Sequence, residues 1–283
     1  MNDRECVELL QWALPRLGLR WQGFKGLRRQ VCRRMAGRMS ELGFADVASY
    51  RRRLEEDPDE LRALDALCFV TISRFYRDRQ VFDALRTTLL PERARAALAR
   101  GDSALRAWSA GCASGEEPYS LAIVWQLEVA PRFPSLALEI LATDFDETVL
   151  GRAVRGCYEQ SSLSELPETL RAAAFDIDID TTNGDEVACV AARFRQGIRF
   201  ERRDIRRFVP VEPQDLVLCR NVAFTYFDEA AQRDFLRRAV ERLVPGGLLV
   251  IGGHEALPPR AAEEHGLVPT PEAPHVFSRQ QES

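Results

Sequence analysis

From residue 104 onward the chain alternates short apolar runs with amphipathic stretches, and this alternation constrains the fold more than any other feature of the sequence. Predicted helices at 116–129, 147–155 and 229–243 follow predicted strands, which lie at 105–109, 136–143, 198–201, 215–219 and 248–252. Such alternation is typical of a parallel sheet covered by helices on both faces. The sequence therefore predicts an α/β fold for this part of the chain.

The alternation lapses at about residues 161–197, where two short runs, 187–191 and 194–200, are typical of antiparallel strands. We expect a small inserted β-subdomain there. Before residue 104 the apolar positions recur every three or four residues, which predicts helices at 27–42, 45–54, 58–68 and 79–99. The length of 283 residues suits one large domain or two modest ones. We predict an all-helical N-terminal domain over 1–95 and an α/β domain over 96–283.

The overall composition favours a cytoplasmic protein. The chain has 39 Lys+Arg against 43 Asp+Glu, and no run of uncharged apolar residues is long enough to span a bilayer. The first residues lack the basic and then apolar build of a signal peptide. The seven cysteines are scattered and never spaced C-x-x-C, which argues against a disulfide framework or a zinc site. We expect reduced thiols and no bound metal.

A basic segment runs through the first predicted helices, with eight Lys and Arg residues and no acidic residue between positions 16 and 38. One interpretation is a solvated helix face. Nucleic-acid binding is a second, but the acidic overall charge and the lack of interleaved aromatic residues count against it. The third, which we favour, is docking against an acidic helix. The docking residues would be Arg28, Arg29, Arg33, Arg34 and Arg38.

A glycine-containing loop follows the first predicted strand, in residues 108–120 (WSAGCASGEEPYS). Gly111 and Gly115 allow a tight turn and a close approach to a ligand. No Lys follows, so this is not a phosphate-binding loop. Glu116 and Glu117 at the helix start suit a ligand with hydroxyls or positive charge, such as the ribose and sulfonium of S-adenosylmethionine. Alternatively, they only complement the helix dipole, which is worth about 0.3–1 kcal/mol.

Two further polar sites follow predicted strands. Asp144 ends the second strand and could accept both hydroxyls of a ribose. The nicotinamide dinucleotide alternative is disfavoured, because the G-x-G-x-x-G fingerprint is missing. Arg220 and Asn221 follow the strand at 215–219, where they would lie at the mouth of the same site. Asp144, Arg220 and Asn221 could alternatively be ordinary turn residues, because these residue types are common where strands end.

Five ordered motifs resemble those of the CheR-type chemotaxis receptor (protein-glutamate) O-methyltransferase family over nearly the whole chain. They are SRFYRD at 73–78, the loop at 108–120, ATDFD at 142–146, CRNV at 219–222 with YFD at 226–228, and PGG at 245–247. The resemblance implies a Rossmann-like S-adenosylmethionine-dependent methyltransferase domain with a small inserted β-subdomain and an all-helical N-terminal domain. It also implies methyl transfer to glutamate side chains of a receptor, with methyl esters as the product.

The same resemblance assigns roles to individual residues. Arg77 and Tyr226 would orient the substrate carboxylate beside the methyl group. The cofactor residues would be Thr71, Ser73, Arg77, Gly111, Glu117, Asp144, Asp204, Ile205, Arg220 and Asn221. The implied partner is the acidic helical region of a receptor cytoplasmic domain, and we expect a monomer that binds no nucleic acid and does not insert into a membrane.

The chain departs from the family pattern near the substrate entrance. One additional residue lies between Asn221 and Tyr226, and residues 252–255 read GGHE where GHSE is usual. Thr71 and Asp204 stand where Asn is usual. Two alternatives therefore stay open: a different protein or small-molecule acceptor, and a non-catalytic module that binds S-adenosylmethionine.

Overall fold

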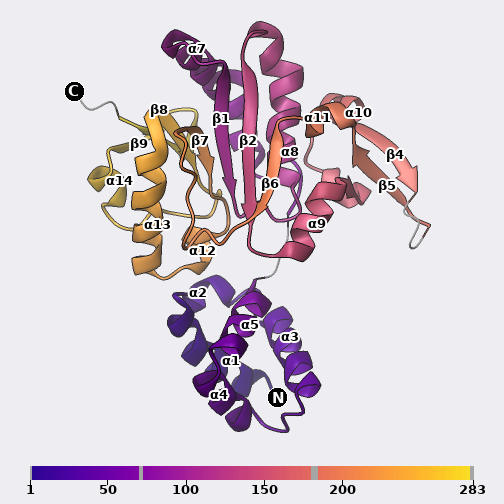
Figure 1. The fold of residues 1–283 in the computed structure, drawn as a ribbon, viewed down its shortest axis with the longest axis vertical. Helices are drawn as coiled ribbons and strands as arrows, with labels where there is room; N and C mark the ends of the chain where they lie inside the picture. The colour runs from indigo at the N-terminus through magenta and orange to yellow at the C-terminus, as the bar shows by residue number, and fades with distance from the viewer. Residues whose placement is uncertain (1, 70–72, 180–183, 281–283) are drawn as a thin grey trace. The chain divides into compact units, whose positions relative to one another are not determined.

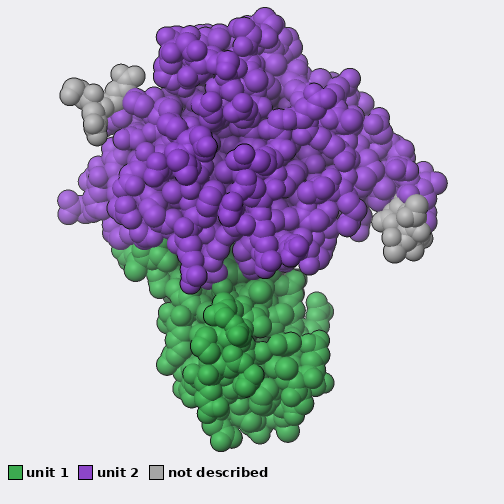
Figure 2. Space-filling view, viewed as in Figure 1, with its two compact units in different colours: residues 1–71, 222–232 green, residues 72–221, 233–283 purple. Residues whose placement is uncertain are grey.

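The structure is a computed structural model that describes residues 2–69, 73–179 and 184–280 (Figure 1). The chain divides into two compact units, which Figure 2 colours separately. Unit 1 comprises Met1–Thr71 and Val222–Gln232, and unit 2 comprises Ile72–Asn221 and Arg233–Ser283. No helix in the described ranges combines the length and the apolar character that crossing a bilayer requires.

Unit 1 is helical, as the periodicity predicts. Its helices are α1 (Asp3–Ala13), the 3₁₀ turn η1 (Leu14–Leu17), α2 (Trp21–Phe24), α3 (Arg28–Glu41), α4 (Val47–Glu56), α5 (Pro58–Cys68) and α12 (Ala223–Tyr226). Local capping explains where they begin. Asn2 forms a capping box with Glu5, and the side chains of Asp46 and Asp57 accept backbone hydrogen bonds at the starts of α4 and α5.

Unit 2 is built on a seven-stranded sheet with the strand order β6-β2-β1-β7-β8-β10-β9. Its strands are β1 (Ala104–Ala110), β2 (Ala137–Asp144), β6 (Ile198–Arg202), β7 (Gln214–Leu218), β8 (Leu243–Val250), β9 (Leu267–Thr270) and β10 (Ala273–Arg279). The first five strands of the order are parallel and β10 is antiparallel to both neighbours. The five predicted strands are confirmed, whereas β9 and β10 were not predicted. The order reverses between β1 and β7, so a ligand site is expected at the carboxyl ends of these strands.

Helices cover the large sheet (Figure 1). They are α6 (Arg79–Ala84), the π turn η2 (Leu85–Leu89), α7 (Leu90–Arg100), α8 (Glu116–Val124) with the turns η3 (Trp125–Val129) and η4 (Ala130–Arg132), α9 (Glu147–Arg155), α13 (Glu229–Arg242) and α14 (Ala261–Glu264). The segment from α6 to α7 belongs to unit 2, although the sequence analysis places the domain boundary at residue 95. The reason is that Phe82, Leu85 and Leu90 are buried in the same core as the strands.

A small antiparallel sheet with the order β3-β5-β4 is inserted between α9 and β6. It contains β3 (Cys157–Tyr158), η5 (Gln160–Leu163), α10 (Glu168–Ala174), β4 (Phe175–Ile179), β5 (Glu186–Val190) and α11 (Ala192–Arg195). The insertion is as expected, but the run at 194–200 is not an antiparallel strand. Its first part forms the end of α11, and its second part enters the large sheet as β6.

The expectation of reduced cysteines is wrong for this structure. Cys6 and Cys32 form one disulfide and Cys157 and Cys189 form another, while Cys68, Cys112 and Cys219 are buried and belong to neither disulfide. An odd number of cysteines therefore does not exclude two disulfides. The bonded pairs are 26 and 32 residues apart in the chain, so packing rather than sequence spacing brings them together.

Candidate functional site

The loop after β1 ties the carboxyl ends of β1 and β2 together. The backbone N–H groups of Gly111 and Cys112 both donate to the carbonyl of Thr143, at 2.8 and 2.9 Å. The indole N–H of Trp108 donates to the hydroxyl of the same threonine at 2.9 Å. Gly115 has a φ of +93°, and a Cβ there would lie 2.9 Å from the Cβ of Ala153. Glycine therefore lets the loop turn sharply and pack against α9.

Asp144 closes this loop from the end of β2. Its Oδ2 accepts the backbone N–H of Ala113 and its Oδ1 accepts that of Asp146, both at 3.0 Å. Burial raises the pKa of the Asp144 carboxyl, although these two N–H groups lower it. The strand-end acid predicted from the sequence is thus a half-buried carboxyl group in direct contact with the glycine loop.

Glu116 and Glu117 begin α8 and are held by different partners. The Ser109 hydroxyl donates to Glu117 Oε1 at 2.6 Å, and Arg220 donates to Glu117 Oε2 at 3.1 Å. The Ser114 hydroxyl donates to Glu116 at 3.0 Å. Burial raises the pKa of Glu116, while hydrogen bonds, including those from Ser114 and Ser73, lower it. Ser73 therefore lies beside the first of the two glutamates.

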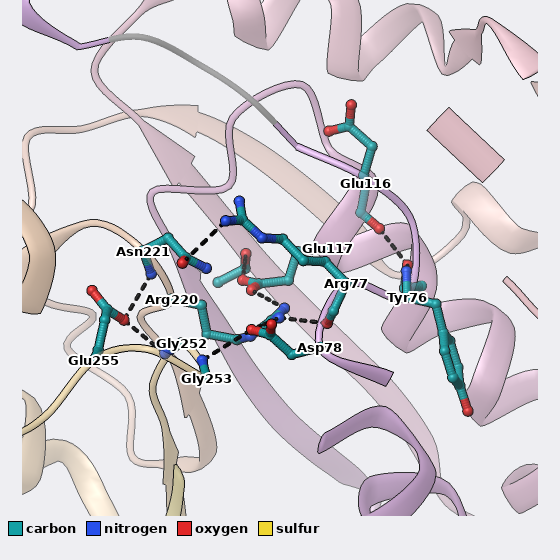
Figure 3. A network of polar contacts seen from close by, with 12 residues as sticks. Tyr76, Arg77, Asp78, Glu116, Glu117, Arg220, Asn221, Gly252, Gly253 and Glu255 are labelled. Carbon is teal, nitrogen blue, oxygen red and sulfur yellow. Dashed lines mark hydrogen bonds and ion pairs between the residues drawn. The ribbon is translucent and has the colours of Figure 1, made fainter. Parts of the chain in front are cut away.

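Arg220 is the centre of a buried polar network (Figure 3). Its guanidinium donates to Asp78 at 2.8 Å, to Glu117, and to the backbone carbonyl of Arg77. It also lies over the ring of Phe82, 5.3 Å from the centroid. The Arg220 side chain is only 3% exposed. It is therefore a fixed structural cation that joins the end of β7 to α8 and to the segment before α6.

Arg77 lies beside this network and is half-buried. Its Nη2 donates to Asn221 Oδ1 at 3.2 Å (Figure 3). Asn221 is anchored in turn, because its backbone N–H donates to the buried carboxylate of Glu255 at 2.8 Å. Glu255 also accepts the N–H of Gly252 at 2.7 Å. The guanidinium of Arg77 is thus positioned by Asn221, which Glu255 anchors in turn.

Sequence reasoning missed Asp78 and Glu255 as members of this site. Asp78 accepts from Arg220 and from the backbone N–H of Gly253, at 2.8 and 3.1 Å. Both acids contact residues more than 30 positions away in the chain, which local spacing does not reveal. Four described non-glycine residues in these loops have positive φ: Tyr76, Asp78, Ala113 and Asn221. Strained backbone of this kind gathers at functional sites.

The other residues predicted to hold the cofactor have local contacts or lie outside the described residues. Asp204 accepts hydrogen bonds from Nε and Nη2 of Arg206, and Ile205 is buried in the same loop after β6. Thr71 lies outside the described residues. Cys112 is buried, and burial raises the pKa of its thiol well above the usual value, which favours the neutral thiol.

Tyr226, the second predicted catalytic residue, ends α12 in unit 1. Its ring is half-buried and packs against two phenylalanine rings, with centroid distances of 5.0 Å to Phe24 and 5.6 Å to Phe69. The tyrosine therefore belongs to a small aromatic cluster of the helical unit.

The five arginines predicted to dock a partner divide into two groups. Arg38 forms an ion pair of 2.7 Å with the buried Glu60, and Arg34 donates to the carbonyl of Phe69 at 2.7 Å. Arg28 forms a longer ion pair, with its Nε 3.6 Å from Asp3 Oδ1. Arg29 and Arg33 are exposed. Part of the basic segment thus stabilises unit 1, and the exposed Arg29 and Arg33 are the ones best able to meet a partner.

The acidic side chains of unit 2 suit the predicted cofactor. Three carboxylates, Glu116, Glu117 and Asp144, lie around the loop at the carboxyl ends of β1 and β2. Carboxylates accept hydrogen bonds from ribose hydroxyls, and they attract an ammonium or sulfonium ion. The same acids would repel a phosphate. The arrangement therefore fits an adenosyl group with positive charge better than a dinucleotide.

Comparison with known proteins agrees with this geometry. The family model described as "CheR methyltransferase, SAM binding domain" matches residues 71–273. A chemotaxis protein methyltransferase from Listeria monocytogenes serovar 1/2a is 33% identical over 228 residues, which cover 81% of each chain. Chemotaxis protein methyltransferase 2 from Vibrio cholerae serotype O1 is 29% identical over 72% of this chain and 69% of its own.

Among solved structures, N-methyltransferase NodS from Bradyrhizobium japonicum WM9 in complex with S-adenosyl-l-homocysteine matches 71% of this chain and 98% of that chain. The TM-score is 0.36 and the sequence identity is 16%. This level of similarity supports no conclusion about activity.

Proposed function

Because the chain belongs to the CheR methyltransferase family, we propose that it methylates glutamate side chains of a chemotaxis-type receptor and forms methyl esters. Residues 71–273 are the S-adenosylmethionine-binding domain of that family, as the motif resemblance predicts. The observation that carries the proposal is the Arg77 guanidinium, held by Asn221 beside the buried Arg220 network at the carboxyl end of β7. Such a fixed fork suits a carboxylate acceptor.

In this proposal the acids of the β1 and β2 loops bind the cofactor. Asp144 would accept the ribose hydroxyls, and Glu116 and Glu117 would face the positively charged end. Ser73, Gly111, Asn221, Asp204 and Ile205 would complete the site, as the family resemblance implies. When bound, S-adenosylmethionine supplies a methyl group on a positively charged sulfur.

The task of the protein is then to position the acceptor. A glutamate side chain has an ordinary pKa of about 4.3 and is already a carboxylate near pH 7, so no general base is needed. One carboxylate oxygen has to meet the methyl carbon in line, at roughly 3 Å. Arg77 would orient the carboxylate through its planar donors, and the hydroxyl of Tyr226 would hold the second oxygen.

Recognition of a protein acceptor would use the exposed part of the basic segment. Arg29 and Arg33 are one helical turn apart on α3 and exposed, so they can meet acidic side chains of a helical partner. We propose an acidic helical region of a receptor cytoplasmic domain as that partner, a cytoplasmic location, and a monomeric enzyme.

The deciding experiment is incubation with methyl-labelled S-adenosylmethionine and a panel of receptor cytoplasmic fragments. We expect label on a receptor fragment that mild alkali releases as methanol, because esters are base-labile. Alkali-stable label would assign a nitrogen or hydroxyl acceptor. Cofactor binding without any transfer would favour the regulatory module.

A further inference from the structure

The segment that carries Tyr226 is bound at both ends to residues 18–20 of unit 1. Leu19 and Phe227 form an antiparallel bridge. The backbone N–H of Arg20 donates to the carbonyl of Tyr226 at 2.8 Å, and that of Asp228 donates to the carbonyl of Gly18 at 2.9 Å. The main chain on the C-terminal side of Tyr226 is therefore fixed by residues some 200 positions earlier.

The Arg20 side chain holds the other side of Tyr226. Its Nε donates to the carbonyl of Thr225 at 3.0 Å, and its Nη2 donates to the carbonyl of Phe224. These carbonyls belong to the end of α12, where a helix has no internal partners for them. A cation at this end is also favoured by the helix dipole. Arg20 thus satisfies two carbonyls immediately before the tyrosine.

Gly23 permits this contact because α2 and α12 touch through their backbones. A Cβ at Gly23 would lie 2.3 Å from the carbonyl oxygen of Thr225 and 3.1 Å from the Cα of Tyr226. Real side-chain atoms do not come this close to backbone atoms, so only glycine fits. The next residue, Phe24, places its ring 5.0 Å from that of Tyr226.

We infer that Arg20 and Gly23 are positioning residues for Tyr226, an inference that rests on the role proposed for that tyrosine. They fix its backbone, while Phe24 and Phe69 fix its ring, so the direction of the hydroxyl is set before an acceptor binds. Arg20 lies within the basic segment but acts inside the protein, and it is not part of the docking surface.

The test uses the full-length chain and two variants, each with a matched control in the same unit. Arg20→Gln removes the charged fork, and its control is Arg52→Gln, at an exposed position on α4. Gly23→Ala adds the clashing Cβ, and its control is Gly26→Ala, where nothing lies within 4 Å. Arg20→Lys keeps the charge and tests partial rescue, because an ammonium lacks the planar fork of the guanidinium.

The first readout is amide hydrogen exchange over residues 222–228, which needs no acceptor. Hydrogen bonds to charged groups are worth about 1.5–3 kcal/mol, so we expect the exchange rate to rise roughly 10- to 150-fold in Arg20→Gln. Gly23→Ala should raise it as well, Arg20→Lys should raise it less, and both controls should match the wild type. Wild-type exchange in both Arg20→Gln and Gly23→Ala would overturn the inference.

The second readout is catalysis on the receptor fragment that accepts most label in the panel above. We expect Arg20→Gln to lower kcat with little change in KM or in the Kd for S-adenosylhomocysteine. The double variant with Tyr226→Phe should be no slower than the slower single variant, since Arg20 acts through the tyrosine. If the fold-reductions in kcat of the two single variants multiply in the double variant, the inference is overturned. If no fragment accepts label, the proposed function fails, while the exchange data still decide whether residues 20 and 23 position Tyr226.

Discussion

Arg220→Met removes the central cation of the buried network and leaves its partners in place. Methionine has a similar length but no charge. Asp78 and Glu117, which the guanidinium contacts at 2.8 and 3.1 Å, would then face each other's negative charge without a counterion. The variant thus isolates the electrostatic role of Arg220.

The size of the effect follows from these distances. Unit charges about 3 Å apart attract by about 5.5 kcal/mol at an effective dielectric constant near 20. Dehydration of the ions offsets much of this, and loss of one partner of a buried pair costs about 3–5 kcal/mol. Asp78 keeps 22% of its side chain exposed, so water relieves part of the penalty. We expect the free energy of unfolding at pH 7 to fall by about 3 kcal/mol, at the lower end of that range.

The loss should depend on pH. Burial raises the pKa of Asp78. The charge and hydrogen bond of Arg220, together with the N–H of Gly253, lower this pKa by more than burial raises it, so the net shift is downward. A carboxyl group with a lowered pKa in the folded state stabilises the fold above its unfolded pKa of about 3.9, and this stabilisation is lost only as the pH falls through the folded value. Without Arg220, Asp78 takes up its proton at higher pH, so the difference in the free energy of unfolding between variant and wild type should narrow from pH 7 toward pH 4.

Urea unfolding at several pH values, followed by tryptophan fluorescence, measures both effects. Arg106→Met is the matched control, because Arg106 pairs with Glu139 at 3.3 Å on the surface, where both side chains are over 40% exposed. It should cost less than about 1 kcal/mol. The electrostatic role of Arg220 would be refuted if both variants lost the same free energy of unfolding, or if the loss for Arg220→Met stayed constant with pH.

Asp144→Ala should weaken S-adenosylhomocysteine binding about 5- to 150-fold, or about 1–3 kcal/mol, and a wild-type Kd in calorimetry would assign the ribose to another group. Methyl transfer to a carboxylate acceptor should change little between about pH 6 and 8, since glutamate titrates near 4.3; a rate that rises through this range would point to an amine or hydroxyl. The double variant Arg29→Glu/Arg33→Glu should raise KM for a protein acceptor and leave cofactor affinity unchanged. Unaltered steady-state kinetics would show that this face of α3 is only solvent-exposed and does not bind the acceptor. Reduction of the Cys6–Cys32 disulfide should lower the free energy of unfolding of unit 1 by up to about 3.5 kcal/mol, and calorimetric scans that coincide with and without reductant would contradict this.

The sheet could be predicted from the sequence because its determinants are local. The apolar strands and the helices between them follow from periodicity, and Asp144 and Arg220 were found because the ends of parallel strands meet at one edge. β9 and β10 were missed because they form an antiparallel hairpin after the strand–helix alternation has ended. Prolines and charges interrupt their apolar pattern.

The site was only partly predictable, since several roles depend on partners distant in the chain. Arg38 was predicted to dock a partner, but it pairs with Glu60, which lies on another helix. Glu255 accepts the backbone N–H groups of Asn221 and Gly252, and Asp78 accepts that of Gly253. Local sequence spacing does not predict such contacts. The pairing of Cys157 with Cys189 likewise follows from the register of β3 against β5.

The division of unit 1 into two chain segments has a consequence for synthesis of the protein. Residues 222–232 complete this unit, yet about 150 residues separate them from its first part. At about 5–20 residues per second, the ribosome needs roughly 8–30 s to make the intervening chain. During that time the nascent helices display Phe24 and the backbone around Gly23 without α12. A fragment that ends at residue 71 keeps this surface permanently uncovered, so isolated N-terminal fragments should associate or bind chaperones.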